Sequence, residues 1–137
     1  MNPNPSSPTF ATLVQEFFCQ RLIRHQNASA QTVASYRDTF RLLLTYLQTR
    51  RKKNLAALTL ADLDAPVVAG FLDHLETQRR NSIRTRNARF AAIRSFLKYA
   101  MARDPASLPI IQRVLAIPMK RFPRLALSYW SREEVAT

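Results

Sequence analysis

Only one glycine, Gly70, occurs in the chain. Hairpin turns and phosphate-cradling loops need glycine because this residue reaches positive φ without a steric penalty. A chain with a single glycine is therefore poorly suited to a sheet built from hairpins. It also has no glycine-rich loop for a dinucleotide or a nucleoside triphosphate. The sequence favours an all-α fold and excludes these two classes of nucleotide-binding protein.

The remaining composition describes one globular unit inside a reducing compartment. The 137 residues are 47% hydrophobic, enough for a single domain with its own core. The lone Cys19 excludes an internal disulfide, and His25 and His74 lack metal-ligand spacing. No run approaches the ~18 apolar residues of a membrane span. We expect a cytoplasmic protein with a buried Cys19 and without a cofactor, a metal, a small-molecule ligand or a membrane partner.

Charge points to a polyanionic partner. The chain has 21 Lys+Arg against 9 Asp+Glu, a formal net charge of +12. Arginine dominates among these cations, and its planar fork suits bidentate contact with phosphates or guanine. A basic field of this size attracts nucleic acid. Nucleic acid is the leading partner that this composition indicates.

Apolar residues at helical spacing predict a bundle of four to five helices. Ser29 and Ser82 are expected N-caps, Thr59 with Asp62 has capping-box spacing, and Asp64 before Pro66 marks a helix start. The predicted helices cover about residues 10–24, 30–50, 65 onward, 83–103 and 107–115.

The same pass divides the chain into four parts. Residues 1–9 are rich in proline and read as a flexible tail, residues 10–115 form the helical domain, and residues 116–130 read as a linker. Ser131 and Glu134 then have capping-box spacing and open a helix near the end of the sequence. We therefore expect residues 131–137 to begin a further domain of a longer protein.

Two of the predicted helices have a basic side opposite or beside an apolar side. In residues 83–103, Phe90, Ile93 and Leu97 fall on the apolar half. The opposite sector is polar and basic, and its central side chains are small. No acid occurs from Thr77 to Arg103. A solvated face is the ordinary explanation of such charge, but the paired basic sides favour contact with a duplex. Arg86 and Arg89 do not fit this wheel and are expected to snorkel or to pair with an acid elsewhere.

The order of these segments resembles a known family. The run Ser29-x-x-Thr32-x-x-x-Tyr36, then LTLADLDAPVVAGFLDHL, SIRTRNARFAAIRSFLKYAM and LALSYWSREEV, is similar to the N-terminal core-binding (SAM-like) domain of tyrosine recombinases, the phage-integrase family. The resemblance covers about residues 10–137. Members often have a glycine before the fourth helix. Here Asn81 is expected to take the left-handed conformation instead.

The resemblance implies one half of a clamp on DNA, with the second and fourth helices in the major groove. It also implies a separate C-terminal catalytic domain with a tyrosine nucleophile, and a tetramer of the full-length protein on DNA. No catalytic residue is expected in residues 1–137, and no tyrosine here inherits the nucleophile role. Integration or recombination of DNA is the activity that the resemblance implies for the parent protein.

The predicted DNA contacts come from these two helices and their starts. If about six phosphates are neutralised, the logarithm of affinity should fall against that of salt concentration with a slope near −5. The residues are Ser29, Thr32, Arg37, Arg41, Lys52, Lys53, Ser82, Arg84, Thr85, Asn87, Arg94 and Lys98.

Two other functions stay open at this point. A non-enzymatic helix-turn-helix regulator would dimerise and use one recognition helix on a palindromic site. A membrane-surface or protein-interaction bundle would need the apolar face of residues 83–103 to be exposed.

Overall fold

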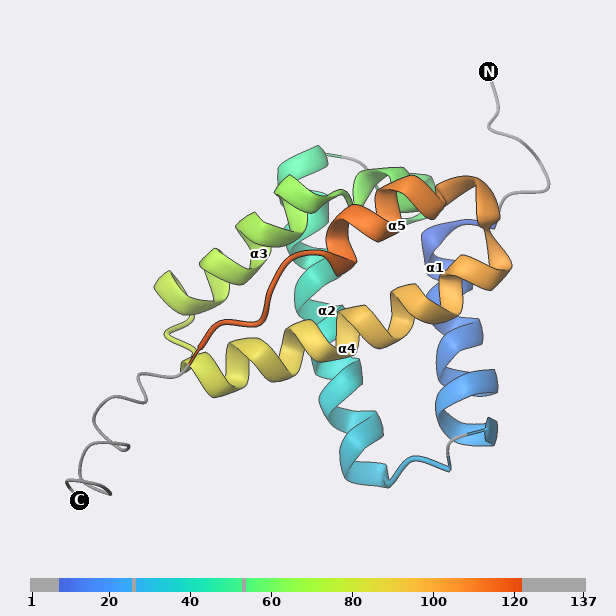
Figure 1. Ribbon diagram of the computed structural model, residues 1–137, viewed down its shortest axis with the longest axis horizontal. Helices are drawn as coiled ribbons and strands as arrows, with labels where there is room; N and C mark the ends of the chain where they lie inside the picture. The colour runs from blue at the N-terminus through green and yellow to red at the C-terminus, as the bar shows by residue number, and fades with distance from the viewer. Residues whose placement is uncertain (1–7, 26, 53, 122–137) are drawn as a thin grey trace.

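The structure is a computed structural model that describes residues 8–25, 27–52 and 54–121. These residues form helices and no strand, so the all-α prediction is confirmed for them. Helix α4 crosses α2 near the middle of the domain, with α3 and α5 on one side of the crossing and α1 on the other (Figure 1). The elements are α1 (Phe10–Glu16), η1 (Phe17–His25), α2 (Ala30–Arg51), η2 (Leu55–Ala57), η3 (Leu60–Asp62), α3 (Ala65–Thr77), α4 (Ile83–Arg103), η4 (Pro105–Ser107) and α5 (Leu108–Leu115).

The first predicted helix is only partly an α-helix. It continues from α1 into the π-helix η1, in which i→i+5 bonding takes more residues into each turn. Regular α-helical spacing would turn Arg21 toward the core, about 40° from Phe17. The wider turns instead bring Leu22 into the core with 1% exposure, while Arg21 lies over the Tyr99 ring at 5.6 Å. The π-helix therefore brings Leu22 to the core, which regular α-helical spacing would have turned away from Phe17.

Most helix starts follow the sequence. Ser29, Asp64 and Ser82 each accept a backbone N–H of the first turn, and Thr59 with Asp62 forms the predicted capping box. The turn before α4 differs, because Arg80 and not Asn81 has positive φ. The Asn81 N–H donates to the Leu75 carbonyl at 2.9 Å, which closes the turn with Arg80 as its left-handed residue.

Phenylalanines from four segments form the centre of the core. The Phe96 ring of α4 lies 5.5 Å from Phe10, 5.7 Å from Phe17 and 5.3 Å from Phe40. All four rings are buried. This cluster ties α1 and η1 to α2 and α4. The apolar face of α4 is therefore covered, which removes the condition for the membrane-surface alternative.

The single glycine has a packing role. Gly70 lies inside α3, and a Cβ built there would be 2.7 Å from the Tyr46 hydroxyl oxygen. The Tyr46 ring is packed against Phe71 and His74, with centroid distances of 5.5 and 5.3 Å. Gly70 therefore lets α3 approach the tyrosine of α2 closely.

One further expectation needs correction, and others lie wholly or partly outside the described part. Cys19 is exposed rather than buried, because η1 turns it to solvent while Phe17 and Leu22 take the core positions. Residues 116–121, expected to belong to a linker, are held against the domain by hydrogen bonds described below. Residues 1–7 and 122–137, including the predicted helix start at Ser131, lie outside the described residues.

Candidate nucleic-acid interface

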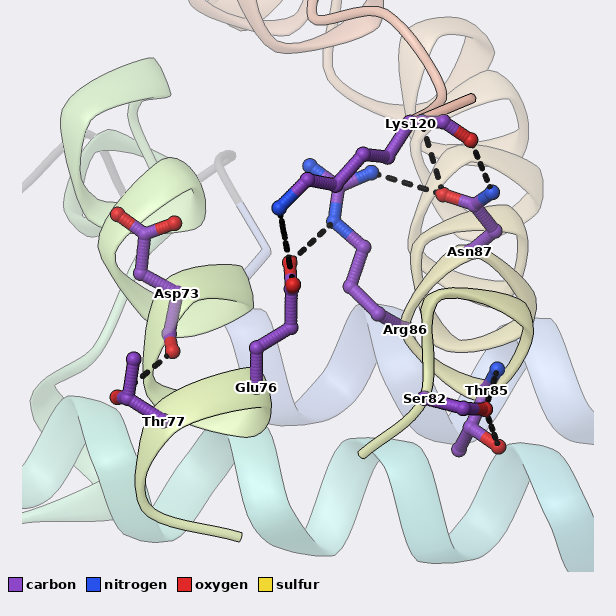
Figure 2. Close-up of polar contacts among 8 residues, drawn as sticks. All are labelled: Asp73, Glu76, Thr77, Ser82, Thr85, Arg86, Asn87 and Lys120. Atoms are coloured by element: carbon purple, nitrogen blue, oxygen red, sulfur yellow. Dashed lines mark hydrogen bonds and ion pairs between the residues drawn. The ribbon is translucent and has the colours of Figure 1, made fainter. Parts of the chain in front are cut away.

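The starts of α2 and α4 have the same geometry. The Ser29 hydroxyl oxygen accepts the Thr32 N–H at 3.1 Å, and its O–H donates to the Thr32 hydroxyl at 3.0 Å. Ser82 and Thr85 repeat both bonds at 3.1 Å (Figure 2). Helix starts leave backbone N–H groups without intrahelical partners, and these groups favour anions such as phosphate.

The hydroxyl pair is in the first place a cap. Thr9 and Thr12 make the same two bonds at the start of α1, at 3.2 and 2.9 Å. The sequence pattern alone therefore does not mark a phosphate site. Whether a capped helix start can bind a phosphate therefore depends on where that start lies in the fold.

The crossing of α2 with α4 places their two starts around one corner. The Arg89 guanidinium donates to the Thr39 hydroxyl at 3.0 Å, and Phe40 meets Phe96 beside it. The segments before Thr39 and before Arg89 run out from this crossing and border the same corner of the domain (Figure 1). The start of α1 lies elsewhere, on the far side of α4.

Small polar residues face this corner. At about 100° per residue, Thr32 and Ser35 lie within about 40° of Thr39 on α2, and Thr85 lies about 40° from Arg89 on α4. Ser35 is exposed, and Thr32 and Thr85 are half-buried. A low surface of this kind lets a phosphate backbone come close to the helix starts.

The basic flank of α2 turns away from α4. Arg37 and Arg41 are exposed, and each lies about 160° around the helix from Thr39, the residue that meets α4. Arg41 also pairs with Asp38 at 3.4 Å. Lys52 is the left-handed C-cap of α2 and is exposed. Lys53 lies outside the described residues.

The outward strip of α4 agrees with the predicted polar sector. Arg84, Ala88 and Lys98 are exposed, and Ala91 and Ser95 between them are half-buried. This strip lies on the side of α4 opposite α2, because Arg89 and Phe96 face α2. The structure therefore does not bring the basic side of α2 next to that of α4.

Two predicted DNA contacts bind the chain itself. The Asn87 side chain forms two hydrogen bonds with the backbone of Lys120, at 2.7 and 3.0 Å (Figure 2). The Arg94 guanidinium donates to the Leu115 carbonyl at the end of α5, at 2.6 Å. Both residues therefore hold the segment that follows α5.

The two arginines that did not fit the wheel have separate explanations. Arg86 is buried and lies 3.6 Å from the Glu76 carboxylate, the acidic partner that the sequence led us to expect. Arg89 is half-buried at the helix crossing, and its Nε has no hydrogen-bond partner among the described residues. Arg89 is thus a basic group at the corner that is not among the DNA contacts predicted from the sequence. The signal that could have identified it is that it does not fit the two-sided pattern of the helical wheel.

A basic pocket, separate from the corner, lies between α2 and the end of α3. Its volume is about 560 Å³, and its cations are Arg41, Arg50, Lys52 and Arg79. Most of them stand at or just beyond the carboxyl ends of α2 and α3, where positive charge is favourable without any ligand. The pocket therefore does not by itself indicate a binding site.

The junction of α1 with the end of α4 contains groups with shifted pKa values, far from the corner. Glu16 accepts two hydrogen bonds from Arg103, both at 2.8 Å, and these bonds are the main reason that its pKa lies below 4.5. Burial raises the pKa of Tyr99, whose hydroxyl donates to Glu16 at 3.2 Å. This network joins α1 to the end of α4 and has a structural role.

The described residues contain neither a metal-ligand cluster nor a membrane-spanning helix. In residues 8–25, 27–52 and 54–121, no three His, Cys, Asp or Glu side chains lie together as ligands for a metal ion. Over the same ranges, every helix is too short or too polar to cross a bilayer.

Comparison with known proteins gives two kinds of match. The family model for the phage integrase N-terminal SAM-like domain matches residues 15–104. The chain is 50% identical over 111 residues to "Putative integrase/recombinase y4rD" of Sinorhizobium fredii, covering 81% of this chain and 40% of that protein. It is 45% identical over 127 residues to "Putative integrase/recombinase y4rC" of the same organism, covering 93% and 38%. The chain thus spans about two fifths of the length of these relatives. No solved structure matches it.

Proposed function

The chain belongs to the phage integrase N-terminal SAM-like domain family, and from this membership we propose that it is the core-binding domain of a site-specific recombinase and binds duplex DNA. The relatives named integrase/recombinase support the recombinase part of the proposal. The observation that carries the DNA part is the corner formed by the starts of α2 and α4, with its paired hydroxyls and the anion preference that helix starts have in general.

The proposed contacts fall into two groups. At the corner, the hydroxyl pairs and the two helix starts bind phosphates, and Arg89 supplies positive charge between them. The second group lies on the side of α4 that faces away from α2: Arg84 and Lys98 contact phosphates there, and Ala88 and Ala91 let the helix come close to the floor of a major groove. The corner pairs are Ser29 with Thr32 and Ser82 with Thr85.

The basic flank of α2 has a different role in this proposal. Arg37, Arg41 and Lys52 face away from α4 and act by long-range attraction, which accelerates encounter with the duplex. Direct neutralisation by Arg84, Arg89 and Lys98 gives a slope of log affinity against log salt near −3. Engagement of both basic sides would give a slope near −5, since about six phosphates would then be neutralised.

A titration of a fluorescent duplex over a range of salt concentrations tests the proposal. The chain should bind random-sequence DNA, because the phosphate contacts do not depend on sequence. Replacing Arg84 and Lys98 by glutamine should lower affinity and reduce the steepness of the slope by about 2. The same change at Arg37 and Arg41 should alter the slope less. A slope close to zero for the unmodified chain would reject the proposal.

The hydroxyl pairs allow a matched control. Replacing Ser29 or Ser82 by alanine should weaken DNA binding, because a phosphate contact at the corner is lost. Replacing Thr9 by alanine removes a cap of the same geometry from α1. The Thr9 variant should lose similar stability, about 0.5–2 kcal/mol, and keep its DNA affinity. Equal affinity losses in all three variants would place the effect in folding and not at the corner.

The activity of the whole protein is also part of the proposal. A catalytic part outside residues 1–137 cuts and rejoins the strands, and the full-length protein assembles as a tetramer on two duplexes. This is tested by expressing the complete reading frame together with a plasmid that carries the DNA sequences flanking the gene's own mobile segment. Recombinant product is expected from the full protein and not from residues 1–137 alone.

A further inference from the structure

The segment that follows α5 runs back across the domain. After Leu115 the chain leaves the helix and passes along α4 to the junction between α3 and α4 (Figure 1). There Lys120 meets Asn87, 33 residues earlier in the sequence. Its path begins at the Arg94 guanidinium, which binds the Leu115 carbonyl. We call residues 116–121 the strap.

Asn87 binds the strap through the backbone of one residue. Its side-chain N–H donates to the Lys120 carbonyl at 2.7 Å, and its side-chain oxygen accepts the Lys120 N–H at 3.0 Å. A carboxamide satisfies a donor and an acceptor together, whereas an aspartate could accept but not donate. The contact thus depends on the amide and not on the side-chain identity of the strap residue.

Charge fixes the same point from the other side. The Lys120 ammonium donates to both carboxylate oxygens of Glu76, at 2.9 and 3.1 Å (Figure 2). Arg86 lies between the two anchors: its Nε is 3.6 Å from Glu76, and its terminal nitrogen donates to the Asn87 oxygen at 2.8 Å. The side chains of Arg86 and Glu76 are only 10% and 20% exposed.

This burial separates the cluster from an ordinary surface ion pair. A buried guanidinium is costly unless a carboxylate and hydrogen-bond acceptors compensate it. Glu76 is also the last acid before the acid-free stretch that runs to Arg103. A single carboxylate therefore serves the buried Arg86 and the strap residue Lys120 together.

We propose that Glu76, Arg86 and Asn87 form a latch that fixes the course of the strap and so sets where the chain leaves the domain. The exit lies beside Asn87 in the second turn of α4, and Ser82 and Thr85 lie at the start of the same helix (Figure 2). If the outward side of α4 binds DNA, as proposed above, the latch delivers the following part of the protein to the same duplex. Asn87 is then a positioning residue for the strap, and DNA is bound without it.

The Lys120 amide reports directly on the latch. Its hydrogen exchange in the 137-residue chain should be slow, because its N–H is bonded to Asn87. In Asn87→Ala both bonds are lost, and exchange at Lys120 together with trypsin cleavage after Lys120 and Arg121 should accelerate about tenfold or more. Asn54→Ala, at an exposed asparagine, is the matched control and should leave both rates unchanged. Unchanged exchange in Asn87→Ala would overturn the latch.

A second variant protects the test against misfolding. Lys120→Met leaves Glu76, Arg86 and Asn87 in place and removes only the charge that Glu76 binds. It should accelerate exchange of the neighbouring strap amides without loss of helix content by circular dichroism. Unchanged exchange would show that Glu76 does not hold the strap.

The DNA titration separates this proposal from the earlier one. Asn87→Ala should keep the affinity and salt slope of the unmodified chain. A loss of DNA affinity with unchanged exchange at Lys120 would make Asn87 a DNA contact and refute the latch. If the unmodified chain binds no DNA, the proposed function fails, and the exchange measurements still decide the latch.

Discussion

Replacing Gly70 by alanine sets two effects of known size against each other. Gly70 lies in the interior of α3, where alanine is favoured over glycine by about 0.8–1.0 kcal/mol. The added Cβ would be 2.7 Å from the Tyr46 hydroxyl oxygen, closer than carbon and oxygen can approach. Either the tyrosine or α3 must move.

The surroundings of Tyr46 restrict this movement. Its ring contacts Phe71 and His74, and the Arg50 guanidinium lies over it at 5.1 Å. Overpacking at such a site costs about 1–3 kcal/mol. Gly70→Ala should therefore be neutral or destabilising by up to about 2 kcal/mol, although alanine is the better helix former.

Removing the Tyr46 hydroxyl should reverse the sign of the stability change caused by Gly70→Ala. In Tyr46→Phe the nearest remaining ring atom, Cζ, is 3.9 Å from the new Cβ, an ordinary contact. Gly70→Ala should then stabilise the chain by about 1 kcal/mol. The two substitutions should couple by about 1–3 kcal/mol in a double-mutant cycle.

Urea denaturation of the four proteins, followed by circular dichroism, measures this coupling at constant m-value. Ala69→Gly, at an exposed position of the same helix, calibrates the propensity effect and should cost about 1 kcal/mol. The same effect of Gly70→Ala with and without the Tyr46 hydroxyl would refute the reasoning.

Three further substitutions test the fold. Phe96→Ala removes the ring that meets three others and should cost about 3–5 kcal/mol of unfolding free energy, measured in urea; a loss below 1 kcal/mol would contradict the aromatic core. Ser82→Ala should cost about 0.5–2 kcal/mol in the same assay, because the cap of α4 is lost. Glu16→Gln should be less stable than the unmodified chain above pH 4.5, where the lowered pKa keeps Glu16 ionised beside Arg103. The melting temperatures of the two proteins should converge as the pH falls through that lowered pKa, since both side chains are then neutral. A difference in melting temperature that does not change with pH would exclude the ion pair.

The sequence predicted the helices well where local chemistry decides them. Ser29, Asp64 and Ser82 each carry the cap in the side chain itself, so the start can be read from one residue and its spacing. The apolar face of α4 was likewise visible from its repeat, and Phe90, Ile93 and Leu97 are buried.

Tertiary contacts decided what the sequence could not. A change from α- to π-helix after Glu16 has no local signal, because the pairing of Leu22 with the core is what selects it. A helical wheel gives the side of one helix but not the direction of its neighbour. The basic sides of α2 and α4 therefore looked as if they faced one duplex together, until the contact between Thr39 and Arg89 fixed their relative rotation.

The candidate site shows the same division. Arg94 and Asn87 lie on the polar side of α4, as the wheel predicted. No pattern in the sequence around them indicates that a segment after α5 returns to bind them. Hydrogen bonds to residues 21 and 33 positions away are outside the reach of periodicity. The residues that stay exposed on that strip, Arg84 and Lys98, keep their predicted place at the surface.

The junction of α1 with α4 affects how the chain can fold during synthesis. Glu16 and Arg103 are 87 residues apart, and Phe10 meets Phe96 across a similar span. A nascent chain on the ribosome therefore cannot form the contacts of Phe10 and Glu16 with α4 until nearly the whole domain has been translated. Closing so long a loop costs little more entropy than closing one of half the length, about 0.6 kcal/mol, but it delays the collapse. The packing of α1 against α4 is therefore among the last contacts that synthesis allows.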